Sequence, residues 1–332
     1  MKFAVGLNLD DKFVNCIAEN KSHISEVYFS WGDFPNGRQN QLMHQSLTPW
    51  EAYDTRIRHL KFLSKNGIKF NLLFNAACYG DDSLSREFFY SVGDTIQYIC
   101  ENFGLSSVTT TSPVIAKFIK TNFDNIDVRA SVNMEIGTYT GMDYLADYYD
   151  GFYMKREFNR NFDVIKKLKQ KCEKNGKKLY MLANSGCLNN CSAHMFHDNL
   201  VSHEKGIAKT DNAYKFTGIC KEHIKKEEKR VSLIRDTNFV RPEDIKLYEP
   251  YFDAVKLATR VSPNPSLILK SYISGHYSGN VLELLEPNHS ADIYPYVLEN
   301  KKISNSFLYC NKDCDNCGKC MENYINSLVR LE

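Results

Sequence analysis

The stretch GFYMKREFNRNFDVIKKLKQKCEKNGKKLYMLAN, residues 151–184, contains the pattern that decides the fold. Two short runs rich in aromatic and aliphatic residues stand at its ends, and they flank an amphipathic segment at 161–172. Asn161 is suited to cap the start of a helix, and Gly176 stands where a left-handed stop is expected. Strand, helix and strand in this order predict one βαβ unit with parallel strands.

Six further runs of the same kind occur along the chain, and all eight are too short for independent helices. Amphipathic stretches lie between them, such as residues 54–66, which end at Gly67. This alternation predicts an α/β fold, a TIM-like (β/α)₈ barrel. An open doubly wound sheet is the alternative, and the absence of a G-x-G-x-x-G motif after the first run disfavours it. The predicted strands are 3–8, 26–31, 70–76, 106–111, 128–133, 151–156, 178–184 and 254–260.

Two segments fall outside the alternation. We expect the barrel to occupy residues 1–299 and to carry an insert, residues 185–230, after the seventh strand. Residues 300–332 form a Cys-rich tail that we expect to bind a metal or a cluster.

The composition is that of an ordinary globular protein, with 43% hydrophobic and 25% charged residues. A net charge of +2 does not by itself indicate a nucleic-acid or membrane partner. No apolar run approaches the length of a membrane span, and the N-terminus turns acidic too soon for a secretory signal. We therefore expect a cytoplasmic protein, in which the 11 cysteines favour metal or redox chemistry over disulfides.

Barrels place their chemistry at the C-terminal ends of strands, and polar residues follow nearly every predicted strand here. Among them, Arg156 and Arg260 can hold an anionic group through paired N–H donors. Glu157 and Glu135 are the candidates for proton transfer. The residues past the strand ends are Asn8, Asp33, Asn75, Cys78, Ser112, Asn133, Glu135, Lys155, Arg156, Glu157, Asn184, Cys187, Thr259 and Arg260.

The tail contains Cys310, Cys314, Cys317 and Cys320, spaced C-x3-C-x2-C-x2-C. Four thiols so close in sequence can converge on one iron–sulfur cluster or one zinc ion. A pair of disulfides is the other reading. The first three cysteines match the spacing that radical SAM enzymes use, but in those enzymes the motif follows the first barrel strand, so we set this match aside.

The insert supplies Cys187, Cys191 and Cys220, which can hold a second centre above the barrel mouth. Simple burial of the thiols is the other reading. The chain contains no H-E-x-x-H, G-x-S-x-G or P-loop motif. Candidates for the fourth ligand of the insert site are Cys78, His194, His197, His203 and one of the tail cysteines.

Three segments together resemble the U32 family, often described as U32 peptidases, and the resemblance extends over residues 70–285 approximately. They are GFYMKREFNRN (151–161), KLYMLANSGCLNNCSAHMF (178–196) and FVRPEDIKLYEPYFDAVKLATRVSPNPSLILKSYISGHYSGN (239–280). The resemblance implies a TIM-like barrel with an iron–sulfur cluster on the cysteines of the loop. It implies cluster ligands at Cys187, Cys191 and Cys220, and mouth residues at Arg156, Glu157, Lys256 and Arg260.

The chain departs from the family pattern in several places. Cys187 and Cys191 are closer together than the usual first pair, no cysteine lies between Cys220 and Cys310, and KLATR replaces KIEGR. The four-cysteine tail is not a general family feature either.

Characterised U32 relatives include enzymes of oxygen-independent hydroxylation, which act on RNA bases or on ubiquinone precursors, and proteins described as proteases. We therefore expect an iron–sulfur oxidoreductase with one or two 4Fe-4S clusters, which modifies an RNA base or an aromatic or quinone-like small molecule. An electron donor or partner protein would serve it. The alternatives are a metal-dependent peptidase, in which zinc replaces iron, and a non-enzymatic iron–sulfur accessory protein in a larger complex.

Overall fold

The computed structural model describes residues 1–38, 47–310 and 312–332. Eight parallel strands form one sheet in the order β7-β6-β5-β4-β3-β2-β1-β8. The ring closes just beyond β7, where the Lys256 amide donates to the carbonyl of Met181 and the Ala183 amide donates to the carbonyl of Lys256, both at 2.9 Å. The strands are β1 (Lys2–Gly6), β2 (Ile24–Phe29), β3 (Phe70–Phe74), β4 (Ser107–Thr110), β5 (Asp127–Ala130), β6 (Gly151–Tyr153), β7 (Lys178–Tyr180) and β8 (Ala254–Leu257).

The prediction of a TIM-like barrel is therefore confirmed, and each of the eight predicted runs contains a strand. Most strands end two to four residues earlier than the apolar runs suggest. The reason is that the backbone leaves the ladder at the mouth, while the following side chains are still buried. Residues 181–183, for example, lie outside β7 but remain buried and face β8.

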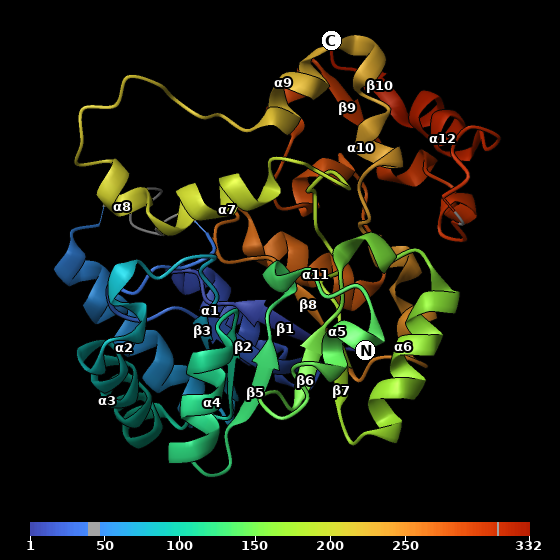
Figure 1. Cartoon of the computed structure of the whole chain (residues 1–332). Coiled ribbons are helices and arrows are strands. Elements are labelled where there is room, and N and C mark those ends of the chain that lie inside the picture. Colours follow the sequence, from blue (N-terminus) through green and yellow to red (C-terminus); the bar gives the residue numbers. More distant parts are fainter. Residues whose placement is uncertain (39–46, 311) are drawn as a thin grey trace.

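Helices surround the strands, and Figure 1 shows α2, α3 and α4 on one side of the barrel and α6 on the other. Asn161 Oδ1 accepts a hydrogen bond from the Val164 amide at 3.0 Å, so the predicted cap of α6 is confirmed. The helix α2 begins earlier than predicted because Thr48 and Glu51 form a capping box. The helices around the barrel are α1 (Asp11–Glu19), α2 (Pro49–Lys65), α3 (Arg86–Phe103), α4 (Pro113–Asn122), α5 (Tyr139–Asp143), α6 (Phe162–Lys174) and α11 (Pro265–Ser274).

The insert and the tail lie above the barrel mouth in Figure 1. Just before the tail, β9 (Tyr296–Leu298) pairs in antiparallel fashion with β10 (Leu328–Arg330), which belongs to the tail. The helices here are α7 (His194–Ser202), α8 (Glu204–Ile207), α9 (Ile219–Lys225), α10 (Ser232–Arg235) and α12 (Lys319–Ser327).

Two main apolar clusters stabilise the molecule. The larger one fills the space between the sheet and the surrounding helices. The smaller one joins the insert to the tail, because residues 224–239 contribute to it together with residues 281–324. The boundary between barrel and tail at residue 300 stays a prediction. The smaller cluster contains residues from both sides of it. Among the described residues, no helix combines the length and the apolar character that a membrane crossing requires.

Candidate functional site at the barrel mouth

The centre of the barrel mouth is a small polar cavity of about 30 Å³. Arg260, just past β8, lies in it and is 4% exposed. Arg38 lies beside it and forms an ion pair with Glu286, with 2.5 Å between Nε and Oε1. Although burial acts to lower it, the pKa of Arg38 is raised above its ordinary value by the Glu286 carboxylate. The mouth thus combines two guanidinium groups with one carboxylate.

Lys256 occupies the inner face of β8 in the same cavity. Its Nζ lies 4.1 Å from the ring centroid of Tyr28 and 5.2 Å from that of Tyr153. Burial lowers the pKa of Lys256 to about 7, and the positive charge of Arg260 acts in the same direction. Near neutral pH this amine is therefore only partly protonated.

A second cavity of about 40 Å³ adjoins the first loop of the insert. Its walls include Arg156, from the 3₁₀ turn Arg156–Phe158 after β6, and Cys187, from the loop after β7. Arg156 Nη1 donates to Cys187 Sγ at 3.6 Å, and Nη2 lies 2.7 Å from His194 Nε2 and 3.5 Å from Glu135 Oε1. Arg156 therefore connects the loop after β5, which carries Glu135, to the loop after β7, which carries Cys187.

Glu135 is the carboxylate at the centre of this group, and its backbone is left-handed with φ 49°. Its Oε1 accepts a hydrogen bond from His194 Nδ1 at 3.0 Å. This hydrogen bond, together with the positive charge of Arg156 and Lys155, holds the pKa of Glu135 at about 2. Glu135 is therefore ionised at neutral pH, and its carboxylate is a weak base.

Glu157 lies at the rim of the same cavity. Its Oε1 accepts from the Asn190 amide at 3.2 Å and lies 3.7 Å from Lys155 Nζ. Its Oε2 is buried and has no hydrogen-bond partner among the described residues. An unsatisfied carboxylate oxygen in a cavity is available to a ligand, which suits the role predicted for Glu157.

The three cysteines of the insert lie on the same side of the mouth. Burial raises the pKa of the Cys220 thiol, and its interactions with Cys187, Cys191 and Asp292 act in the same direction. Cys187 and Cys191 line the same cavity, and Cys220 lies near enough to interact with both. Asp292 lies near them too, and no sequence motif indicates it.

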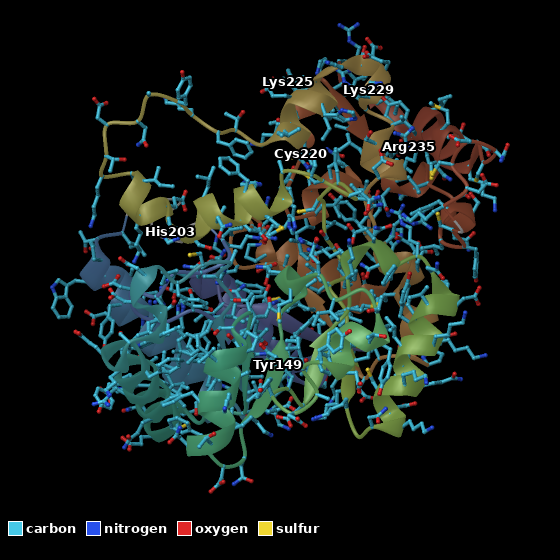
Figure 2. The ribbon with its side chains drawn as sticks, in the orientation of Figure 1. Tyr149, His203, Cys220, Lys225, Lys229 and Arg235 are labelled. Carbon is cyan, nitrogen blue, oxygen red and sulfur yellow. The ribbon has the colours of Figure 1, made fainter. Side chains whose placement is uncertain are left out.

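The candidates for a fourth ligand lie in different places. His194 faces Glu135 and Arg156, whereas Cys78 accepts a hydrogen bond from the Gly80 amide at 3.4 Å. Figure 2 shows His203 well apart from Cys220, toward the other end of the insert helices. Among the described residues, no three His, Cys, Asp or Glu side chains lie close enough together to coordinate a metal ion without rearrangement.

The tail cysteines line a separate and larger cavity of about 480 Å³. Cys314 and Cys317 are exposed, while Cys310 and Cys320 are partly buried. Burial raises the pKa of the Cys320 thiol, Arg160 lowers it, and the other three tail thiols raise it. The four thiols therefore share one neighbourhood, as their spacing predicts.

Three mouth residues escaped the sequence analysis for identifiable reasons. Arg38 comes nine residues after the end of β2, so a search of the positions just past each strand stops short of it. Glu286 reaches the mouth through an isolated bridge to Ser185, and no periodic pattern indicates this. Asp292 is likewise distant in sequence from the cysteines that it approaches. In contrast, His194 was predicted from the sequence, but only as a metal ligand.

No protein-family model matches the chain. It is 26% identical over 314 residues to a curated protein of Methanocaldococcus jannaschii, uncharacterized protease MJ1657, and the alignment covers 91% of this chain and 88% of that protein. The solved structure of the U32 peptidase Mk0906 matches 77% of this chain and 91% of its own length, with a TM-score of 0.56 and 14% identity, and so shares the fold. The resemblance to the U32 family that the sequence motifs predict is thereby confirmed.

Proposed function

We propose that this chain is a U32-like iron–sulfur enzyme that modifies an RNA base, or an aromatic or quinone-like small molecule, by redox or oxygen-independent hydroxylation-type chemistry. The observation that carries the proposal is that Cys187 and Cys191 line one cavity beside the polar barrel mouth, with Cys220 near enough to interact with both. Thiolate donors suit iron–sulfur clusters, and zinc is the alternative metal. A cluster held there would supply electron transfer or a Lewis-acidic iron.

The chain's own residues would bind and orient the substrate. Arg38, Lys256 and Arg260 make the centre of the mouth cationic, which favours a phosphate, a carboxylate or an electron-rich ring. Arg156 already contacts Cys187, His194 and Glu135, so its role is to position the loop that carries Cys187. This differs from the anion-holding role expected for it.

Proton transfer would fall to Glu157 and to the His194 imidazole that Glu135 holds. The pKa of Glu135 is about 2, so its carboxylate is a weak base whose role is to accept from His194 Nδ1 at 3.0 Å and orient the imidazole. Glu157 has a buried oxygen without a described partner and can contact a substrate directly. Both proton-transfer groups lie in the cavity that Cys187 and Cys191 line, so acid–base groups and the proposed cluster would share one site.

The test is a metal analysis of the full chain purified without oxygen. We expect brown protein with absorption near ~400 nm, and about four iron atoms per occupied centre. The C187S/C191S variant should lose the iron of the mouth centre, whereas the C172S variant, which changes a buried helix cysteine, should keep it. Colourless protein with stoichiometric zinc would refute the iron–sulfur proposal. A comparison of modified nucleosides and quinones in a strain lacking the gene would then identify the substrate.

A peptidase is the second candidate function. It is favoured by the names of the two similar proteins and by a thiol, an imidazole and a carboxylate around one cavity, from Cys187, His194 and Glu135. Asp198 lies outside the cavity lining, 3.3 Å from His194 Nε2. However, the His194 nitrogens contact Glu135, Arg156 and Asp198, and no hydrogen bond joins His194 to Cys187 among the described contacts. Thiol catalysis requires that bond. Digestion of fluorescent casein by the wild type but not by C187S would favour this candidate.

A further inference from the structure

Arg160 is a fully buried guanidinium without a carboxylate partner. It is 2% exposed, and Nη1 donates to the carbonyl of Ile234 at 2.8 Å. Its Nε and Nη2 donate to the carbonyl of Phe239 at 3.3 Å and 3.2 Å. No acidic side chain forms an ion pair with it in the part of the chain that the structure describes. A buried charge with only neutral acceptors is costly unless an anion compensates it.

Arg241 is a second buried arginine in this part of the fold and serves as a comparison for Arg160. It is 6% exposed, and the Asp244 carboxylate holds it through two hydrogen bonds, at 2.7 Å from Nε and 3.0 Å from Nη2. Both arginines contact the ring of Phe307. One of the two neighbours therefore has a bidentate carboxylate and the other has none.

The tail contacts Arg160 through its backbone and through the ring of Phe307. The Cys310 amide donates to the carbonyl of Arg160 at 3.2 Å, and Phe307, whose ring centroid lies 4.1 Å from the Arg160 guanidinium carbon, lines the tail cavity. The four tail thiols line that same cavity. The anion that Arg160 lacks can therefore come from the tail.

We propose that Cys310, Cys314, Cys317 and Cys320 hold a tetrathiolate metal centre whose negative charge compensates Arg160, and that this centre is independent of the cysteines at the barrel mouth. Four thiolates on Zn²⁺ or on an oxidised 4Fe-4S cluster both give a net charge of about −2. A pair of disulfides would be neutral and would leave Arg160 uncompensated.

The cavity leaves room for such a centre. Its volume of about 480 Å³ exceeds what one metal ion needs, and the thiols line it without converging. Cys314 and Cys317 belong to an exposed turn before α12, which can move toward Cys310 and Cys320 when a metal binds. Arg235 also lines the cavity, but Asp236 already pairs with it at 2.8 Å.

The first test measures iron, zinc and sulfide in the full chain purified without oxygen. The C314S/C317S variant changes two exposed side chains, so the fold should tolerate it. We expect this variant to lose the metal of the tail centre, and C187S/C191S to retain it. Iron with sulfide identifies a cluster, and zinc alone identifies a zinc site. Unchanged metal content in C314S/C317S would overturn the proposal.

The second test asks whether Arg160 depends on the charge of the centre. We expect chelation to lower the Tm of the wild type by roughly 5 °C more than that of R160M, because only the wild type is left with an uncompensated buried cation. The R235M variant is the matched control, since Arg235 lines the same cavity with its own carboxylate, and it should respond like the wild type. An equal loss in R160M and the wild type would refute the role of Arg160.

This inference does not rest on the proposed function. If the metal content falls in C314S/C317S but not in C187S/C191S, the tail centre is supported and the mouth centre is refuted. Metal that depends on Cys187 and Cys191 alone would do the reverse.

Discussion

At the residue scale, the charged and polar side chains around the mouth hold one another in position through direct contacts. Glu135 accepts from His194, His194 contacts Arg156, and Arg156 donates to the thiol of Cys187. A change in one member therefore alters the position of the next, and single substitutions here test the network as a unit.

The E135Q variant tests the carboxylate of this network. Folding lowers the pKa of Glu135 from 4.5 to about 2, so the ionised form stabilises the fold above pH 4.5, and this contribution is lost as the pH falls toward 2. We expect E135Q to be less stable than the wild type by roughly 1 to 2 kcal/mol at pH 7, after allowance for solvent screening. Urea unfolding at several pH values measures this. A stability difference that persists at about pH 2 would contradict the prediction.

The K256M variant tests the buried amine. Folding lowers the pKa of Lys256 from 10.5 to about 7. The free energy of unfolding of the wild type therefore decreases as the pH falls from 10.5 to 7, because protonation favours the unfolded state. We expect K256M to gain roughly 1 to 3 kcal/mol relative to the wild type between pH 10 and pH 7. Urea unfolding at the two pH values measures the gain. A constant difference between the two proteins would mean that Lys256 is charged in the fold.

At the scale of elements, the loop after β7 is the one that positions the cysteines. The Gly186 amide donates to the carbonyl of Glu286 at 2.9 Å, and this contact brings Cys187 to the mouth. A Cβ on Gly186 would lie 2.2 Å from the carbonyl oxygen of Pro287, which belongs to the backbone and cannot rotate away. Close approach of two backbone segments therefore requires glycine at this position.

The G186A variant should lose roughly 2 to 4 kcal/mol of stability, because one of the two segments must move. It should also retain less metal at Cys187 and Cys191 than the wild type. Thermal unfolding and metal analysis check both outcomes. The control is G206A, since a Cβ there meets no atom within 4 Å. If G186A matched G206A, the two segments would be free to separate.

At the scale of the whole molecule, the insert and the tail form a second body of structure on the barrel. The tail residues Phe307, Leu308 and Tyr324 are buried in the smaller apolar cluster together with Ile224 and Leu233 of the other segments. The tail is therefore bound into the fold by packing as well as by any metal that it holds.

Deletion of residues 300–332 should lower the Tm and cause aggregation, because it exposes the remaining apolar residues of this cluster. Thermal unfolding and light scattering measure both effects. Deletion of the exposed residues 331–332 is the control and should have little effect. A soluble truncated chain with the Tm of the wild type would show that the barrel is independent of the tail.

Much of this architecture follows from local patterns. Short apolar runs, amphipathic stretches, Asn161 and Gly176 predict the eight strands and their helices, because strand and helix periodicity depend on neighbouring residues. The cysteine spacing similarly predicts that the tail thiols share one neighbourhood, as they do. The partners of Arg156 were not predictable, since His194 and Glu135 reach it from separate loops.

The sequence by itself determined the barrel, the concentration of polar residues at the C-terminal ends of its strands, and the cysteines that are candidates for metal binding. Only the tertiary structure decided that Glu286 and Asp292 approach the mouth and its thiols, and that Arg160 lacks a carboxylate. The physical reason is the distance along the chain over which each effect acts. Backbone periodicity is set within a few residues, whereas charge compensation depends on groups that the fold brings together from distant parts of the chain.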